Sequence, residues 1–323
     1  MSVSLPPERS LVSVAASSLL SVPASSERFF AKAAASAADT VMFDLEDAVA
    51  PEHKDAARQM AIAAVNGLDW GTKTVLVRCN GLDTGWAYRD LIALAEHCPR
   101  LDGVMVPKVG APRDVHFVET LLAQAAVTAA RARPLHIEVL VESALGVSQV
   151  ESIAAASPLL AAISFGPGDY AASMGNRARR IGGPDADYAV LTDPGPDGRR
   201  ERHWNDAWHY PMARLATACR AHGLRAMDGP YVDFHDPEGF RAAARRARAL
   251  GYEGKWCIHP SQIELANEIF SPSPAEIEWA RALLDTMAKA HAGGSGAVAV
   301  GGQMFDLAHV KQAERILAKR PAK

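Results

Sequence analysis

Eight short apolar segments constrain the fold of this 323-residue chain more than any other feature of its sequence. Each runs for about four to eight residues and is bounded by glycine, proline or charge, as is typical of strands buried on both faces. Alanine-rich stretches that favour helices separate most of them, and several begin at a Ser or Asp suited to capping a helix. The predicted strands are 18–23, 40–45, 74–80, 103–108, 137–142, 162–166, 224–229 and 255–260.

Strand and helix alternating eight times indicate an α/β fold, a (β/α)₈ TIM barrel with a parallel core. A doubly wound sheet stays possible, because a count of segments does not prove that the sheet closes. No glycine-rich dinucleotide or P-loop fingerprint favours that alternative. The chain is longer than the roughly 250 residues of a bare barrel. We therefore expect the barrel over residues 1–265 and, over residues 266–323, a C-terminal helical extension with a lid segment.

Composition indicates an ordinary globular protein. Hydrophobic residues make up 49% of the chain and charged residues 22%, and the formal charge of −3 gives no basic excess to attract nucleic acid or an anionic membrane. No apolar run approaches the ~20 residues of a spanning helix. The cysteines show no metal-binding or CxxC spacing, which favours a reducing cytoplasm. They are Cys79, Cys98, Cys219 and Cys257.

Three carboxylates close predicted strands, where a barrel enzyme keeps its chemistry: Glu46, Glu142 and Asp169. Glu142 and Asp169 follow consecutive strands, so they should face one pocket. Two such close carboxylates either share a proton or hold a cation between them. Oxygen ligands without His or Cys favour Mg²⁺, or Mn²⁺, and Glu46 and Asp47 could hold its waters. Alternatively, each acid pairs with a loop arginine or caps a helix.

Three basic residues also lie in or after predicted strands. Arg78 lies inside an apolar run, and a buried arginine needs an anion, either a substrate carboxylate or enolate or a structural salt-bridge partner. Lys108 occupies a position from which a lysine can form a Schiff base, although the neighbouring carboxylates favour simple charge balance. His259 could serve as a base or as a structural hydrogen-bonding group.

Seven motifs in order resemble the citrate lyase β-subunit-like branch of the HpcH/HpaI aldolase family. The resemblance runs from about residue 18 to the C-terminus. Further segments look most like the L-malyl-CoA/β-methylmalyl-CoA lyase subgroup. The family motifs lie at 43–58, 77–84, 106–108, 141–146, 165–175, 227–240 and 254–262, and the subgroup segments at 66–71, 181–183, 187–193 and 203–210.

The resemblance implies a role for each matching residue. Glu142 and Asp169 match residues that bind Mg²⁺, and Arg78 matches one that binds glyoxylate or the acyl-enolate. In the family, a C-terminal segment covers the active site of a neighbouring subunit and brings an acid, here Asp306, toward the thioester. A homo-oligomer, trimer or hexamer, is expected. Val141 and Gly168 match backbone positions that line the substrate, and Lys32, Cys257 and Ile258 match positions that contact coenzyme A.

The first strand departs from the family pattern. The Arg-Ser-like pair usual there reads Ser17-Ser18, an aromatic position is Ser21, and an arginine that contacts coenzyme A is replaced by Ser26. Arg28 offers a substitute charge two residues on. The positions expected to bind metal are intact.

The sequence therefore predicts a Mg²⁺-dependent acyl-CoA lyase that reversibly cleaves malyl-CoA or β-methylmalyl-CoA. The products would be glyoxylate and acetyl-CoA or propionyl-CoA. Arg78 and the metal would oppose the developing negative charge, and Asp306 would exchange a proton at the acyl α-carbon, with Glu46 and Asp47 nearby. The alternatives are a malyl-CoA thioesterase or citramalyl-CoA lyase on the same site, and a non-catalytic paralogue that has lost coenzyme A binding.

Overall fold

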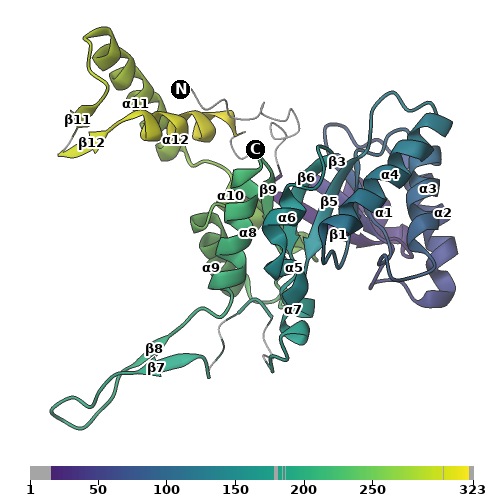
Figure 1. Cartoon of the computed structure of the whole chain (residues 1–323), viewed down its shortest axis with the longest axis horizontal. Helices are drawn as coiled ribbons and strands as arrows, with labels where there is room; N and C mark the ends of the chain where they lie inside the picture. The colour runs from purple at the N-terminus through teal and green to yellow at the C-terminus, as the bar shows by residue number, and fades with distance from the viewer. Residues whose placement is uncertain (1–15, 178–180, 184, 186, 301, 320–323) are drawn as a thin grey trace.

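The computed structural model describes residues 16–177, 181–183, 185, 187–300 and 302–319. Eight parallel strands close into a barrel in the order β1-β10-β9-β6-β5-β4-β3-β2 (Figure 1). Closure by pairing of the first and last strands rules out the doubly wound alternative and confirms the predicted TIM barrel. The strands match the eight predicted segments: β1 (Ser18–Pro23), β2 (Thr40–Asp44), β3 (Thr74–Arg78), β4 (Gly103–Val106), β5 (His136–Val141), β6 (Leu160–Phe165), β9 (Arg225–Asp228) and β10 (Gly254–Cys257).

Alternation along the strands produces two separate cores. Leu140 of β5 and Trp256 of β10 belong to a small cluster inside the barrel, whereas Val141 and Cys257 belong to the large cluster between strands and helices. Successive side chains of a strand point to opposite faces. A residue two positions beyond Leu140 therefore points toward the barrel axis, and this places the carboxylate of Glu142 over the mouth.

Helices cover the outside of the barrel (Figure 1). The eighth barrel helix, α10, packs against α9, β10 and β1, and the expected domain boundary at residue 265 falls inside it. Among the described residues, no helix is long and apolar enough to cross a bilayer. The helices of the barrel layer are α1 (Phe30–Ala34), α2 (Lys54–Gly67), α3 (Ala87–His97), α4 (Pro112–Thr128), α5 (Ala144–Ser148), α6 (Val150–Ala154), α7 (Pro167–Ser173), α8 (His209–Ala221), α9 (Pro237–Ala249) and α10 (Ile263–Phe270), with short 3-10 turns at Glu27–Phe29, Pro51–His53 and Pro260–Gln262.

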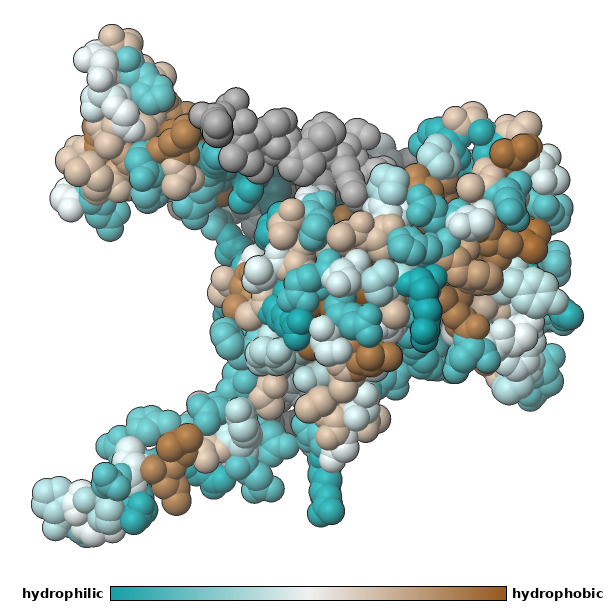
Figure 2. All heavy atoms as spheres, in the orientation of Figure 1, coloured by the Kyte–Doolittle hydropathy of each residue, from teal (hydrophilic) through white to brown (hydrophobic). Residues whose placement is uncertain are grey.

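An arm that the strand predictions missed projects between α7 and α8. Its strands β7 (Ala189–Leu191) and β8 (Arg202–Trp204) form an antiparallel pair that extends away from the barrel (Figure 1). The side chains of Val190 and Leu191 are more than half exposed, and Figure 2 shows apolar surface along this arm. Three-residue strands carry too little periodicity to be predicted from sequence.

The C-terminal extension forms a separate small unit. It consists of α11 (Pro274–Ala292), β11 (Val298–Val300), β12 (Gln303–Phe305) and α12 (Leu307–Ala318), packed on a core of their own. The glycine-rich segment expected to be a hinge is thus partly a hairpin. Helix α10 returns along the barrel from the end of β10, so the chain leaves at the end opposite the mouth. There Arg248, at the end of α9, pairs with Glu276 of α11.

Candidate active site

The carboxyl ends of the strands surround a cavity of about 460 Å³ at the barrel mouth. Arg78, Glu142 and Asp169 all line it, so three of the predicted site residues converge on one space. Asp47 lines it as well, while Glu46 lies beside it and is only 5% exposed. The mouth of this barrel is therefore rich in acidic groups around one buried guanidinium.

Arg78 is held by acidic residues from the end of β2. Its Nε and Nη2 donate to the two carboxylate oxygens of Asp44 at 2.8 and 2.6 Å. Its Nη1 lies 2.9 Å from Oε2 of Glu46, and its guanidinium lies over the ring of Trp256. The neighbouring carboxylates outweigh burial and hold the pKa of Arg78 above its usual value. Arg78 is thus both ion-paired, as one hypothesis held, and exposed to the cavity, as the other required.

Asp44 is the functional residue that sequence reasoning missed. It accepts the Arg78 fork and the backbone N–H of Glu46 at 2.8 Å, and it is 2% exposed. Strand β2 is buried on both faces, so its apolar residues show no alternation to separate an inward from an outward position. Its inward position follows from the structure, in which Met42 belongs to the inner core and Asp44 follows it by two.

Lys108 balances charge at this site. Its Nζ lies 2.8 Å from Glu46 and 3.5 Å from Asp47, and these carboxylates hold its pKa well above normal despite partial burial. An amine must be neutral to form a Schiff base, so the structure favours the charge-balancing role. The backbone φ of Lys108 is +56°, a conformation uncommon outside glycine, and its N–H donates to Glu142 at 2.9 Å.

Glu142 is a buried carboxyl group in an unfavourable environment for its charge. Burial, followed by the negative charges of Asp169 and Glu46, raises its pKa to about 9. Gly166 lies against it so closely that an added Cβ would come within 2.5 Å of the carboxylate. The absence of a side chain at residue 166 therefore leaves room for the carboxyl group of Glu142.

Asp169 lies on a helix rather than on a strand end, which corrects the sequence interpretation. Strand β6 ends at Phe165, and Asp169 occupies the first turn of α7, which begins at Pro167. Proline favours the first turn of a helix, so the strand gives way to the helix within two residues. The side chain still lines the cavity and is close enough for its charge to raise the pKa of Glu142.

The carboxylates of Glu142 and Asp169 fit a magnesium ion. Both carboxylates line the cavity, and burial followed by the charges of Asp169 and Glu46 raises the pKa of Glu142, so a cation bound between them would relieve an unfavourable charge. Over the described ranges, no group of three His, Cys, Asp or Glu residues is arranged to hold a metal. A site with two carboxylates suits Mg²⁺, which keeps several of its waters. It does not suit a structural Zn²⁺, which needs a closed set of four protein ligands.

Of the residues expected to contact the substrate or coenzyme A, some line the cavity or are exposed, and others have buried side chains. Gly168 and Ile258 line the cavity, and Lys32 is exposed on α1. Val141 and Cys257 are fully buried, with side chains directed away from the barrel axis, so only their backbone could contact a ligand. Burial also raises the pKa of the Cys257 thiol to about 12, which makes it a poor nucleophile.

Asp306 does not lie at the mouth of its own barrel. It caps the N-terminus of α12, accepts from Ala308 N–H at 3.0 Å and lies 2.9 Å from Nδ1 of His309. The contact with His309 lowers the pKa of Asp306. Because the C-terminal unit leaves the barrel at the far end, the expected lid does not cover the site of the same chain. Its action on a neighbouring subunit stays a prediction.

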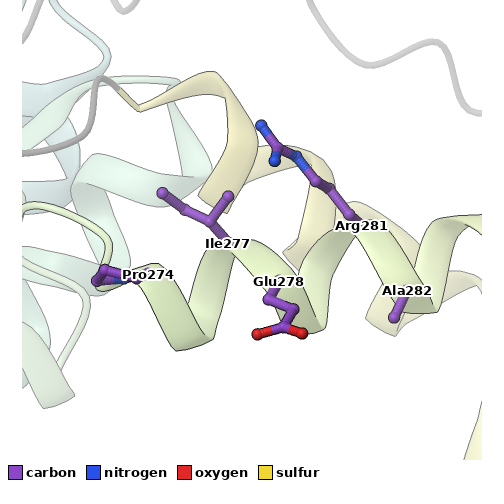
Figure 3. A pocket seen from close by; sticks show the side chains of 5 residues that line it. All are labelled: Pro274, Ile277, Glu278, Arg281 and Ala282. Atoms are coloured by element: carbon purple, nitrogen blue, oxygen red, sulfur yellow. The ribbon is translucent and has the colours of Figure 1, made fainter.

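A larger hollow of about 620 Å³ lies elsewhere, on α11 (Figure 3). All its lining residues come from that one helix, and Glu278 and Arg281 are its ionisable groups. The smaller cavity at the barrel mouth brings buried acids and an arginine together from several strands. Its chemistry, rather than its size, makes it the candidate active site.

Comparison with known proteins decides the family. A family model described as HpcH/HpaI aldolase/citrate lyase matches residues 17–260. The chain belongs to this family. The match begins just before β1 and ends just after β10, so it covers every strand of the barrel.

The curated relatives of this chain include a lyase and a thioesterase. An L-malyl-CoA/β-methylmalyl-CoA lyase from Cereibacter sphaeroides is 48% identical over 296 residues, covering 91% of each chain. A (3S)-malyl-CoA thioesterase from the same species is 35% identical over 94% of each chain.

A solved structure of the same family supports the fold. The CitE protein of Mycobacterium tuberculosis, in complex with magnesium, acetoacetate and coenzyme A, is 31% identical and has a TM-score of 0.70. The similarity covers 94% of this chain and 98% of CitE. It therefore extends beyond the barrel into the C-terminal unit.

Proposed function

We propose that this protein is a Mg²⁺-dependent carbon–carbon lyase that reversibly cleaves malyl-CoA or β-methylmalyl-CoA. The products are glyoxylate and acetyl-CoA or propionyl-CoA. The observation that carries the proposal is 48% identity to a lyase of that name over 91% of both chains. The convergence of Arg78, Glu142 and Asp169 on one cavity supports it, because the reaction needs a metal site and an anion-binding group side by side.

The residues at the mouth suit the charges of this reaction. In cleavage a base takes the β-hydroxyl proton, the carbon–carbon bond breaks, and its electron pair forms a thioester enolate, which takes a proton from an acid at its α-carbon. Arg78 binds the carboxylate of the glyoxylate portion with the N–H groups that Asp44 and Glu46 leave free. Mg²⁺ held by Glu142 and Asp169 would supply positive charge for the glyoxylate oxygens. Fixed positive groups of this kind are worth most where water is excluded.

Thioester hydrolysis is the second candidate reaction. It is favoured by the 35% identity to a malyl-CoA thioesterase, and citramalyl-CoA cleavage remains a variant of the lyase reaction. A lyase must keep water from the thioester, whereas a thioesterase must admit it. Purified protein given malyl-CoA and Mg²⁺ should release glyoxylate and acetyl-CoA in equal amounts. Free coenzyme A and malate instead would make it a thioesterase, and unchanged malyl-CoA would support a non-catalytic paralogue.

Loss of coenzyme A binding is the concern raised by Ser17, Ser21 and Ser26. Ser17 is buried and its N–H donates to Asp39, so it is part of the structure at the start of β1. Ser21 lines the cavity. We expect the changes at these positions to alter affinity for the thioester. They should not alter the chemistry, because the residues expected to bind the metal and the glyoxylate carboxylate are intact.

We place the protein in the cytoplasm, since its four cysteines are free and buried.

We propose that Asp306 acts at the site of a neighbouring subunit in a homo-oligomer. The contact with His309 lowers the pKa of this exposed carboxylate, so it is ionised near neutral pH and, in the condensation direction, can accept a proton from the acyl α-carbon. Its position away from its own barrel mouth supports a site supplied by another chain.

Mixed oligomers test this sharing of sites. Asp306→Ala chains and Glu142→Gln chains should each be inactive, and co-refolding them should restore part of the activity. Restored sites would combine an intact metal site with an intact donated acid. No recovery in oligomers verified by mass spectrometry to contain both chains would contradict the sharing.

A further inference from the structure

The acidic loop around Arg78 has a support that the reaction scheme does not use. Lys54 is the first residue of α2, and its side chain folds back under this loop, with 6% of the residue exposed. Its Nζ donates to the backbone carbonyls of Leu45 at 2.8 Å and Glu46 at 2.6 Å. A buried ammonium group therefore holds the backbone of the two residues that follow Asp44 in the chain.

The same helix also contacts, through Asp90, the segment that follows Arg78 at the end of β3. Arg58, one turn after Lys54, donates from Nε to Asp90 at 2.6 Å. The other oxygen of Asp90 accepts from the backbone and side-chain nitrogens of Asn80, two residues beyond Arg78. One face of α2 thus braces both segments from which the Arg78 ion-pair network is built.

We propose that Lys54 is a positioning residue that holds Glu46 against Arg78 and so fixes the guanidinium for substrate binding. The proposal rests on the proposed lyase function, in which Arg78 binds the glyoxylate carboxylate. Glu46 reaches Arg78 only if its backbone is fixed, because its carboxylate must lie 2.9 Å from Nη1 and 2.8 Å from Lys108 together. Lys54 also places a positive charge behind Asp44 and Glu46, two acids buried at the mouth.

A second lysine provides a matched control at the other end of the barrel. Nζ of Lys73 donates to the carbonyls of Ser36 at 2.5 Å and Ala38 at 3.1 Å, in the loop before β2. Lys54 and Lys73 each tie two carbonyls of one loop, but only Lys54 lies near the site. Features at the bottom of a barrel serve stability rather than catalysis.

The test compares Lys54→Met with Lys73→Met. Both should unfold at lower urea concentration than the wild type, since each loses two hydrogen bonds. Only Lys54→Met should lower kcat, by on the order of 10-fold to 100-fold, the size typical of groups that support a site through another residue. In the condensation direction KM for glyoxylate should rise, because Arg78 binds its carboxylate, while KM for acetyl-CoA should stay near the wild-type value. Lys54→Arg, which keeps charge and donors, should recover part of kcat.

A second readout does not depend on activity. In protein labelled with ¹⁵N-arginine, the Nε–H signal of Arg78, assigned by its loss in Arg78→Lys, reports the Asp44 and Glu46 contacts. It should shift or broaden in Lys54→Met and remain in place in Lys73→Met. If Lys54→Met does not fold, Lys54→Gln, whose shorter and uncharged side chain loses the ammonium group and cannot reach both carbonyls in the same way, serves in both measurements.

Unchanged kcat together with an unchanged Arg78 signal in the Lys54 variant would overturn the proposal and leave Lys54 a structural brace. An equal loss of kcat in Lys73→Met would do the same. A wild-type protein without activity on any acyl-CoA would remove the proposed function. The Arg78 signal would then still decide whether Lys54 positions the guanidinium.

Discussion

Glu142→Gln should lower turnover severely while making the metal-free protein more stable at alkaline pH. The substitution removes one of two charged ligands for Mg²⁺, so activity should fall on the order of 100-fold or more. It also removes a buried carboxyl group whose pKa is raised to about 9, chiefly by burial. Steady-state kinetics and thermal unfolding, each with and without Mg²⁺ after exhaustive chelation, measure the two effects.

The sign of the stability effect follows from proton binding. In the metal-free fold the pKa of Glu142 is raised to about 9, so it keeps its proton up to that pH, whereas the unfolded chain loses it near pH 4.5, the usual pKa of a glutamate. The unfolded state therefore binds fewer protons between these values, and the free energy of unfolding declines as pH rises through this window. Glu142→Gln should lack this decline, and Mg²⁺ should raise the melting temperature of the wild type far more than that of the variant.

Two outcomes would contradict this account of Glu142. Near-wild-type activity of Glu142→Gln after chelation and addition of Mg²⁺ would remove it from the metal site. A metal-free variant that melts below the wild type at pH 8 would show that the carboxylate is stabilised by its surroundings rather than strained by them.

Arg78→Lys should lower kcat/KM on the order of 100-fold while the barrel stays folded. Lysine keeps the charge but cannot hold Asp44 through two parallel hydrogen bonds and also present donors to a substrate. Some stability should also be lost, about 1.5–3 kcal/mol for a charge-assisted hydrogen bond. Kinetics and urea unfolding of the same preparations separate the two losses.

Arg225→Lys is the control for this substitution. Arg225 is 4% exposed inside the barrel and donates to Glu138 at 2.8 Å, away from the cavity lining. It should lose a similar amount of stability and retain its turnover. If Arg78→Lys behaves like Arg225→Lys, with lower stability and normal kinetics, Arg78 is a structural ion-pair partner alone.

The barrel could be predicted from sequence because its strands are buried on both faces. Such strands read as uninterrupted apolar runs bounded by turn residues, and each of the eight runs became a strand. The arm of β7 and β8 could not be predicted in this way, since three-residue strands that pair only with each other need no buried face.

The predicted site residues were those whose position at a strand end is visible in the sequence. Glu142 and Arg78 follow or end apolar runs, and both line the cavity. Asp44 was hidden because a doubly buried strand does not show which residues point inward. Lys54 was hidden because a lysine at the start of an amphipathic helix looks like a solvated residue. Its burial depends on the path of the loop that precedes α2.

The placement of Asp306 depends on information of another kind. The sequence identifies a glycine-rich segment followed by an acid, but not the direction in which the extension leaves the barrel. That direction is set by α10, which runs back along the outside of the barrel before α11 begins.

The most direct test of the central claim runs the reaction in the condensation direction. Purified protein, glyoxylate and Mg²⁺ are incubated with acetyl-CoA or propionyl-CoA, and the acyl-CoA pool is followed by mass spectrometry. The account predicts conversion of each acyl-CoA into the thioester enlarged by one glyoxylate, abolished by EDTA and restored by Mg²⁺. Release of free coenzyme A without the enlarged thioester, or no change in either acyl-CoA, would contradict it.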